Sequence, residues 1–382
     1  MLLYVTGSYP ENQEGIASGA KVLLDAMVDI VGKEKILLLT TDTPIISNNI
    51  DKNALVEYRF LNNWRVTKKN IQRVERILDQ YPISAVHMEY PGDLYGKTFL
   101  ASFLPWIVHR YSKKKNRKIT YNVRLHEFTR ARFLRKLAII PILMAADRIY
   151  VPAQKDREVI SRFAKERVFK TTIGTNIKVI EENLRIDSKL EEKITISYFG
   201  SVYPGKGIER MLSFWKKIKE KDSKNEYRFK VIGEIGTDEN NHFREYHEQV
   251  WRLIEELGLK DVLEVTGFVT DEEVSKEIGK SSVATLFYED GLTLRRGSFL
   301  AYLAHGIPIV TSLGDDETRE LFEGARGICM ASDDETAEEA VYRLAHLAMD
   351  DRKEIRNENI ALSEYFDWKK IASGFLNDYG IF

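Results

Sequence analysis

The chain has 382 residues, 43% of them apolar and 30% charged, which fits a soluble globular protein long enough for two domains. No apolar run reaches the roughly 18–20 residues that a membrane-spanning helix needs, and the single cysteine excludes an internal disulfide framework. The net charge of −1 conceals an asymmetry, since residues 1–180 hold 30 Lys and Arg against 17 Asp and Glu, and residues 181–382 hold 27 against 41.

Short apolar runs alternate with helical patterns through the first half of the chain. We expect strands at Leu2–Val5, Ile36–Thr40, Ala85–Met88, Ile119–Val123 and Arg148–Val151, and helices at Lys21–Val31 and Thr67–Leu78. Glycines at positions 7, 15 and 19 predict a loop over 7–19. Strands that alternate with helices favour a parallel sheet with helices on both faces.

A charged segment over 180–193 interrupts this alternation, and we expect it to be a linker. The pattern then resumes, with strands expected at Ile194–Phe199, Phe229–Ile232, Leu263–Thr266, Val283–Tyr288 and Pro308–Thr311, and helices at Gly207–Ile218, Asn241–Leu257, Asp271–Ile278, Ser298–His305, Thr336–Met349 and Phe366–Tyr379. The sequence therefore predicts an α/β protein with two Rossmann-like doubly wound domains. Such domains facing each other bind ligands in the cleft at the carboxyl ends of both sheets.

The densest basic segment runs from Arg110 to Lys136 and holds eleven Lys and Arg against one acid, Glu127. A solvated surface, an anionic membrane surface and an anionic acceptor each explain this segment. No zinc pattern or RNA-binding signature accompanies it, so we expect no nucleic-acid partner.

Two loops of the second half have the composition of phosphate sites. In the first, a strand ends at Gly200 and a Pro-Gly turn leads to Lys206-Gly207 before a helix. Glycine admits a close ligand, the helix start offers free N–H groups, and lysine adds a positive charge. An ordinary strand–helix loop with a solvated lysine explains the same pattern.

The second loop places two arginines directly before a helix. After the strand that ends at Tyr288 come, in order, Glu289, Asp290, Gly291, Arg295, Arg296, Gly297 and Ser298. Ser298 is the expected N-cap, and arginine at a helix start suits bidentate contact with phosphate. Pairing of the arginines with Glu289 and Asp290 is the alternative.

These loops resemble the nucleotide-sugar half of GT-B glycosyltransferases, with glycosyltransferase family 4 as the most similar group. The motifs that carry the resemblance are Gly200 to Gly207, the acidic-Gly-Leu loop at 289–292, Ala304 to Pro308, and Phe366-Asp367-Trp368, which opens a terminal helix. It covers most of residues 1–20, 119–177 and 194–379. It implies an acceptor-side domain over 1–179 completed by a crossing helix at 366–382, a linker over 180–193, and a donor domain over 194–365.

The resemblance also implies roles for individual residues. His126 would contact the transferred sugar, although a structural strand-cap role remains an alternative, and Glu289 or Asp290 would replace the family's first glutamate. The implied donor and diphosphate contacts are Gly15, Gly200, Lys206, Gly207, Gly233, Arg295, Arg296, Gly297 and Ser298. The acceptor-side candidates are Tyr9, Glu89, Tyr90 and Arg124.

The sequence departs from the family pattern in two places. Alignment on Ala304 to Pro308 puts Ala301 where the second glutamate and its ribose contact would be, and Ser201 stands where an arginine is frequent. We interpret the chain as a member of a divergent subgroup in which Arg295 and Arg296 supply the missing charge. No Asp-x-Asp follows an apolar strand, so we expect metal-independent transfer and no cofactor.

The expected activity is retaining transfer of a sugar from a UDP- or GDP-sugar to a saccharide or lipid-linked acceptor in envelope polysaccharide or glycoconjugate synthesis. The single cysteine fits a reducing compartment, so we expect a cytoplasmic protein, and the basic first half suggests peripheral contact at the inner face of the membrane. Two alternatives stay open: a nucleotide-sugar 2-epimerase of the same fold, and a non-catalytic glycosyltransferase-like subunit that binds a partner enzyme.

Overall fold

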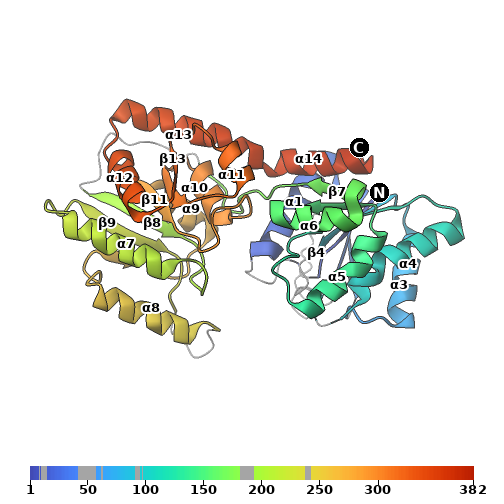
Figure 1. Cartoon of the computed structure of the whole chain (residues 1–382). Coiled ribbons are helices and arrows are strands. Elements are labelled where there is room, and N and C mark those ends of the chain that lie inside the picture. The colour runs from blue at the N-terminus through green and yellow to red at the C-terminus, as the bar shows by residue number, and fades with distance from the viewer. Residues whose placement is uncertain are drawn as a thin grey trace. The chain divides into compact units, whose positions relative to one another are not determined.

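A computed structural model describes residues 1–7, 9, 15–41, 57–61, 63–90, 95–96, 98–180, 193–236 and 242–382. The chain divides into two compact units (Figure 1): unit 1 comprises Met1–Asn176 with Phe366–Phe382, and unit 2 comprises Ile177–Tyr365. The linker expected over 180–193 lies almost wholly outside the described residues.

Unit 1 is built on a seven-stranded parallel sheet with the strand order β3-β2-β1-β4-β5-β6-β7. Its inner strands are rich in Leu, Val and Ile and are buried on both faces, as parallel strands between helices require. The strands are β1 (Leu2–Val5), β2 (Ile36–Thr41), β3 (Glu57–Leu61), β4 (Ala85–Tyr90), β5 (Thr120–Leu125), β6 (Arg148–Val151) and β7 (Val168–Lys170).

Helices cover both faces of this sheet. One hydrophobic core joins the sheet to α3 (Lys68–Gln80), α4 (Leu100–Lys115), α5 (Phe133–Ala145) and α6 (Gln154–Ala164). The core on the opposite face joins it to α1 (Gly15–Val31) and the C-terminal α14 (Trp368–Tyr379). No helix in the described part of the chain is long and apolar enough to cross a bilayer.

Unit 2 repeats the same topology with six parallel strands in the order β10-β9-β8-β11-β12-β13. The strands are β8 (Ile194–Phe199), β9 (Tyr227–Ile232), β10 (Leu263–Val265), β11 (Val283–Leu286), β12 (Ile309–Ser312) and β13 (Ile328–Ala331). The helices are α7 (Ile208–Lys221), α8 (Arg244–Glu256), α9 (Asp271–Gly279), α10 (Gly297–Ala304), α11 (Asp316–Leu321), α12 (Asp334–Ala345) and α13 (Met349–Ser363). The predicted fold class, two Rossmann-like doubly wound domains, is confirmed.

Several predicted boundaries are wrong. The expected loop over 7–19 ends early, because α1 already begins at Gly15. The helix expected over Thr336–Met349 is two helices, α12 and α13, with a break after Ala345. Helices α4, α5, α6, α11 and α13 were not predicted, nor were strands β3, β7 and β13.

The C-terminal helix α14 completes unit 1 through Trp368. The indole is 9% exposed, donates a hydrogen bond from Nε1 to the carbonyl oxygen of Thr175 at 2.8 Å, and has the Arg124 guanidinium 5.3 Å from its ring. A Cβ at Gly174 would lie 2.6 Å from that Nε1, so glycine is needed where the two segments meet.

We expect Trp368→Ala to lower the free energy of unfolding of unit 1 by about 3–5 kcal/mol, because it leaves a large cavity and an unpaired carbonyl. Denaturant titration followed by circular dichroism measures this loss. Phe382→Ala is the matched control, because its side chain is 64% exposed near the same terminus. Equal stability of the two variants would contradict this account of α14.

Candidate functional site

In both sheets the order of the strands reverses beside the first strand, between β1 and β4 in unit 1 and between β8 and β11 in unit 2. In open parallel sheets, ligands bind beyond the carboxyl ends of the strands at such a switch point. The two loops with phosphate-site composition follow β8 and β11, so both begin at the switch point of unit 2.

Three separate segments of unit 2 meet at this point. A Cβ at Gly233, after β9, would lie 2.6 Å from the carbonyl oxygen of Gly200, after β8. A Cβ at Gly200 would in turn lie 3.7 Å from the Cβ of Ser298, in the first turn of α10. The structure therefore brings together three of the predicted donor residues.

The loop between β8 and α7 also lies against the end of β11. A Cβ at Gly207 would overlap the carbonyl oxygen of Phe287, and Gly207 has a φ of 72°. Glycine is required there by both the space and the backbone conformation. A Cβ at Gly205 would lie 3.8 Å from Oε2 of Glu289, so the acidic loop borders the glycine turn.

Cationic groups and helix ends surround this junction. The Lys206 ammonium lies 4.8 Å from the centroid of the Tyr203 ring. Gly207 and Arg296 are the N-caps of α7 and α10, and neither helix start has a side-chain cap. The uncapped N–H groups and the lysine give the junction positive electrostatic character.

The arginine pair is more constrained than expected. Arg296 is ion-paired with Asp290, and its guanidinium lies 4.3 Å from the centroid of the Tyr288 ring. The side chains of Arg296 and Asp290 are 14% and 28% exposed, and Arg295 is half-buried. The structure therefore contains, for Arg296, the ion pair with the acidic loop that was the alternative to phosphate binding.

Ser298 is not the N-cap that was predicted. α10 begins at Gly297 with Arg296 as the N-cap, and the Ser298 hydroxyl lies 2.8 Å from the hydroxyl of Tyr288. Burial raises the pKa of Tyr288 to about 12, against the opposing effects of Ser298 and Arg296, so this phenol stays protonated. Ala301, at the place of the family's ribose-binding glutamate, is fully buried.

His247 on α8 is a residue of this junction that sequence reasoning missed. Its Nδ1 lies 2.6 Å from the carbonyl oxygen of Gly236 and its Nε2 lies 2.7 Å from that of Val202. His247 therefore ties the loop after β8 to the loop after β9.

The predicted residues of unit 1 form a second cluster at the ends of β4 and β5. His126 is 13% exposed in its side chain, and its Nε2 lies 2.5 Å from Oε2 of Glu89. The other oxygen of Glu89 accepts hydrogen bonds from His87 at 2.9 Å and Arg124 at 3.2 Å. The carboxylate is fully buried, so protein donors replace water around it.

This network keeps Glu89 in its charged form. Burial alone would raise the pKa of the Glu89 carboxyl, but Arg124 and His126 hold it well below its usual range. Burial lowers the pKa of His87, whose Nδ1 lies 2.6 Å from the Tyr379 hydroxyl of α14. A stable carboxylate thus orients the one partly exposed group, His126.

The burial of Glu89 and Arg124 corrects their predicted role as direct acceptor contacts. They are 0% and 1% exposed, respectively, and Arg124 also donates to the carbonyl oxygen of Thr172 at 2.8 Å. Tyr9 and Tyr90 are each 4% exposed, and Gly15 lies in the first turn of α1.

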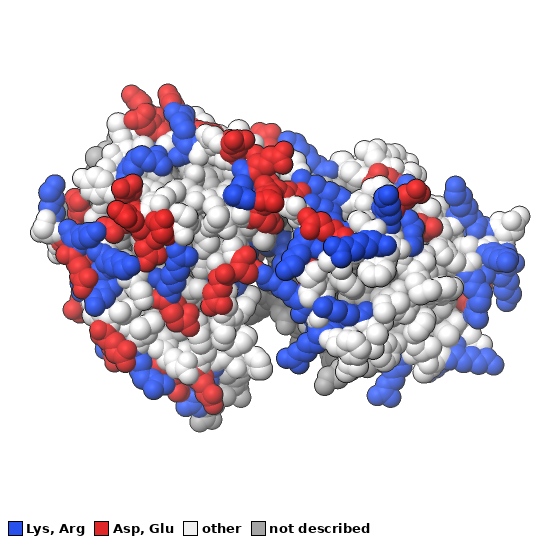
Figure 2. Space-filling view, in the orientation of Figure 1, with Lys and Arg blue, Asp and Glu red and all other residues white. Residues whose placement is uncertain are grey.

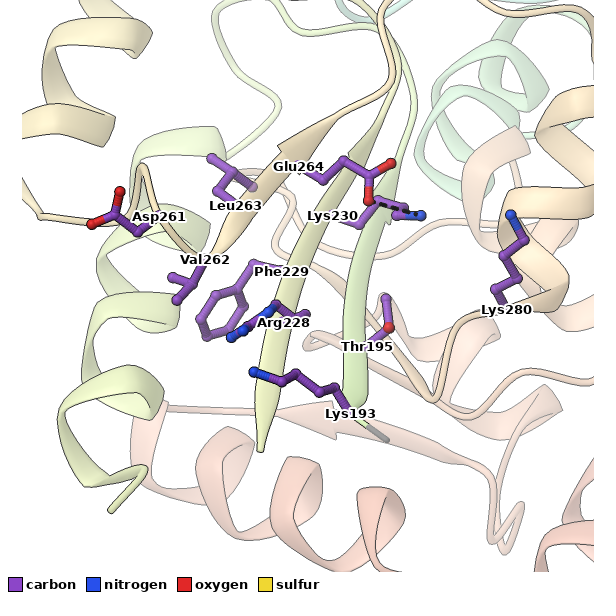
Figure 3. A pocket seen from close by; sticks show the side chains of 10 residues that line it. All are labelled: Lys193, Thr195, Arg228, Phe229, Lys230, Asp261, Val262, Leu263, Glu264 and Lys280. Carbon is purple, nitrogen blue, oxygen red and sulfur yellow. Dashed lines mark ion pairs between the residues drawn. The ribbon is translucent and has the colours of Figure 1, made fainter. Parts of the chain in front are cut away.

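A pocket of about 390 Å³ opens at the opposite, amino edge of the unit 2 sheet (Figure 3). Four cationic side chains line it: Lys193, Arg228, Lys230 and Lys280. Lys230 is paired with Glu264 at 3.2 Å. This pocket is separate from the glycine loops, which follow the carboxyl ends of the strands.

Among the described residues, no group of three or more His, Cys, Asp or Glu is placed to hold a metal.

Comparison with known proteins agrees with this geometry. Residues 193–349 match the family model described as glycosyl transferases group 1. No curated protein matches the chain significantly by sequence.

Solved structures match both units. A glycosyltransferase from Rickettsia africae has a TM-score of 0.71 at 13% identity, over 99% of this chain and 97% of that one. Anabaena HepE in complex with UDP has a TM-score of 0.68 at 14% identity, over 99% of each chain. The lipopolysaccharide outer core galactosyltransferase WaaB has a TM-score of 0.65 at 12% identity, again over 99% of each. These likenesses establish the two-domain GT-B fold. Residues 193–349, which contain all the loops that meet in unit 2, are similar to glycosyl transferases group 1.

Proposed function

We propose that this enzyme moves a sugar, with retention of configuration, from a UDP- or GDP-sugar to a saccharide or lipid-linked acceptor in polysaccharide or glycoconjugate synthesis. The observation that carries the proposal is the meeting of Gly200, Gly233 and Ser298 at the switch point of unit 2. The similarity of residues 193–349 to glycosyl transferases group 1 and the UDP complex of Anabaena HepE support a nucleotide-sugar donor.

In this proposal the donor diphosphate lies over the glycine loops. The leaving nucleoside diphosphate gains negative charge as the glycosidic bond breaks, and fixed positive groups lower the energy of that state. Lys206, Arg295, Arg296 and the starts of α7 and α10 supply such groups, with Gly207 and Gly297 admitting the phosphates. Transfer then needs no metal ion.

The acidic loop and His126 contact the sugar in this proposal. Asp290, held by Arg296, or the exposed Glu289 binds the sugar hydroxyls, and the imidazole of His126 lies near the reacting carbon. Gly15 is proposed to lie by the diphosphate, and Tyr9 and Tyr90 to shape the acceptor side. The retaining outcome is inferred from the family resemblance.

The proposed place of action is the cytoplasmic face of a membrane. A lipid-linked saccharide is anchored in the bilayer, so an enzyme that uses it must work at the surface. The basic first half of the chain suits an anionic surface.

A donor panel tests the activity directly. The protein is incubated with UDP- and GDP-sugars in EDTA, and nucleotide binding and release are followed. We expect one donor to bind and to release its nucleotide with the chelator present. No binding of any donor would favour a non-catalytic subunit, and free epimerised sugar with UDP would indicate an epimerase.

Arg296→Ala should weaken nucleoside diphosphate binding by about 1–3 kcal/mol, because a charge-assisted hydrogen bond is lost. Isothermal titration calorimetry with UDP and GDP measures this loss of affinity. Arg326→Ala is the control, because Arg326 also pairs with glutamates of unit 2 but precedes β13 at the amino edge of the sheet. Equal affinities of the two variants would refute the assignment.

Glu89→Gln should lower the free energy of unfolding at pH 7 by about 3–5 kcal/mol, because Arg124 becomes a buried charge without its counterion. The depressed pKa of Glu89 stabilises the fold above its ordinary value of 4.5, and this contribution is lost as pH falls below that value. The difference in unfolding free energy between the native chain and Glu89→Gln should therefore become smaller below pH 4.5.

Denaturant titrations at pH 7, 5 and 4 measure this difference. The control is Glu75→Gln, which removes a pair with the 67% exposed Arg110 and should change stability by less than about 1 kcal/mol. If the difference in unfolding free energy between the native chain and Glu89→Gln did not change with pH, the Glu89 charge would contribute nothing to stability.

A further inference from the structure

Two helices of unit 1 expose an unusual number of large apolar side chains. We call this surface the α4–α5 ridge, and its eight members are between 41% and 76% exposed. They are Phe99, Phe103, Trp106, Phe133, Leu134, Leu137, Ile140 and Met144. Single exposed apolar residues are common, but a contiguous group of this size marks an interaction site.

The ridge is a regular feature of both helices. On α5, Phe133, Leu137, Ile140 and Met144 follow the helical spacing of one face, whereas Ile139 and its neighbours are buried in the core. α5 therefore has apolar residues on its outer face as well as on its packed face.

The two helices present one surface. Phe99, Phe103 and Trp106 recur on α4 with the same helical spacing. The indole Nε1 of Trp106 donates a hydrogen bond to the carbonyl oxygen of Pro141, on α5, at 3.0 Å. The ridge thus stands on packed helices that hold its shape.

Basic residues border the ridge. The outer face of α4 continues beyond Trp106 with Arg110, Lys113 and Lys114, which are exposed. The start of α5 adds Arg132 and Lys136. In Figure 2 an uncharged area lies where Figure 1 draws α4 and α5, with lysine and arginine atoms around it.

Most of these cations have no acidic partner in the described part of the chain. Lys113, Lys114, Arg132 and Lys136 pair with none there, whereas Arg110 pairs with Glu75 at 2.9 Å. Apolar side chains surrounded by free cations are the composition that binds at a bilayer interface with anionic lipid.

We propose that the α4–α5 ridge docks unit 1 on a bilayer that contains anionic phospholipid. The apolar side chains enter the interface, and the surrounding lysines and arginines contact the lipid phosphates. A protein partner would need a complementary acidic rim, and a second copy would bring the same cations face to face.

The position of the ridge gives it a use in catalysis. Phe133 follows His126 by seven residues, and His126 lies at the carboxyl end of β5. Docking through α5 would hold His126 near the level of the lipid headgroups, where a lipid-linked acceptor presents its sugar. This use rests on the proposed function, whereas docking itself does not.

Vesicle co-sedimentation of the full chain tests the proposal. We expect binding to vesicles of phosphatidylcholine with phosphatidylglycerol and weaker binding to phosphatidylcholine alone. Phe133→Glu with Leu137→Glu should weaken the partition coefficient by roughly 100-fold or more, because two apolar side chains no longer insert. Lys113→Gln with Lys114→Gln should weaken it by roughly 10–30-fold on the anionic vesicles only.

Phe268→Glu is the matched control, because Phe268 is 66% exposed in unit 2 and should not change vesicle binding. Thermal melts confirm that each variant is folded, and nucleotide titration separates docking from donor binding. The proposal is overturned if the native chain does not sediment with anionic vesicles. It is equally overturned if Phe133→Glu with Leu137→Glu sediments with these vesicles as strongly as the native chain. It is also overturned if light scattering shows a dimer that Phe133→Glu with Leu137→Glu dissociates, because a second copy would then cover the ridge.

Discussion

Unit 2 of this protein depends on one close backbone approach. Gly207 lies so near the carbonyl oxygen of Phe287 that no side chain fits between them. This contact places the start of α7 beside the end of β11, across the switch point of the sheet. The loop after β9 joins through Gly233 and Gly200, and His247 fixes the two loops by hydrogen bonds to their carbonyl oxygens. Positive groups are thereby organised before any ligand arrives, which is how electrostatic stabilisation becomes effective.

The switch point of unit 1 is organised differently. A buried carboxylate, Glu89, lies there, and its oxygens contact His87, Arg124 and His126. Leaving such a charge without partners in the interior would be strongly unfavourable, so each partner is held in place by the others. His87 extends the network to Tyr379 on α14, which makes the C-terminal helix part of the support for His126. Removal of α14 would therefore disturb the site as well as the core.

The sequence predicted the features that depend on local chemistry. Leu2–Val5 is a continuous apolar run, Ile194–Phe199 is rich in β-branched and aromatic residues, and both strands are confirmed. Helices α4 and α5 were not predicted, because apolar residues occur on both of their faces and each contains a proline. The periodic contrast between apolar and polar residues is therefore weak. Ser298 was mistaken for a cap because Tyr288 takes its hydroxyl. His247 has no signal in the sequence, because its partners are carbonyls 11 and 45 positions away.

The two proposed binding surfaces differ in the range over which their charges act. Residues 181–382 carry an excess of acids, so the diphosphate gains little from the long-range field of that half. Its binding must come from contacts within a few ångströms, such as that with the 14% exposed Arg296, and salt screens buried contacts weakly. Lys113 and Lys114 beside the α4–α5 ridge are exposed, and their attraction to lipid is screened beyond about 8 Å at physiological salt. Raising the ionic strength should therefore release the protein from anionic vesicles at salt concentrations that leave nucleotide binding largely intact, which separates the two surfaces without any mutation.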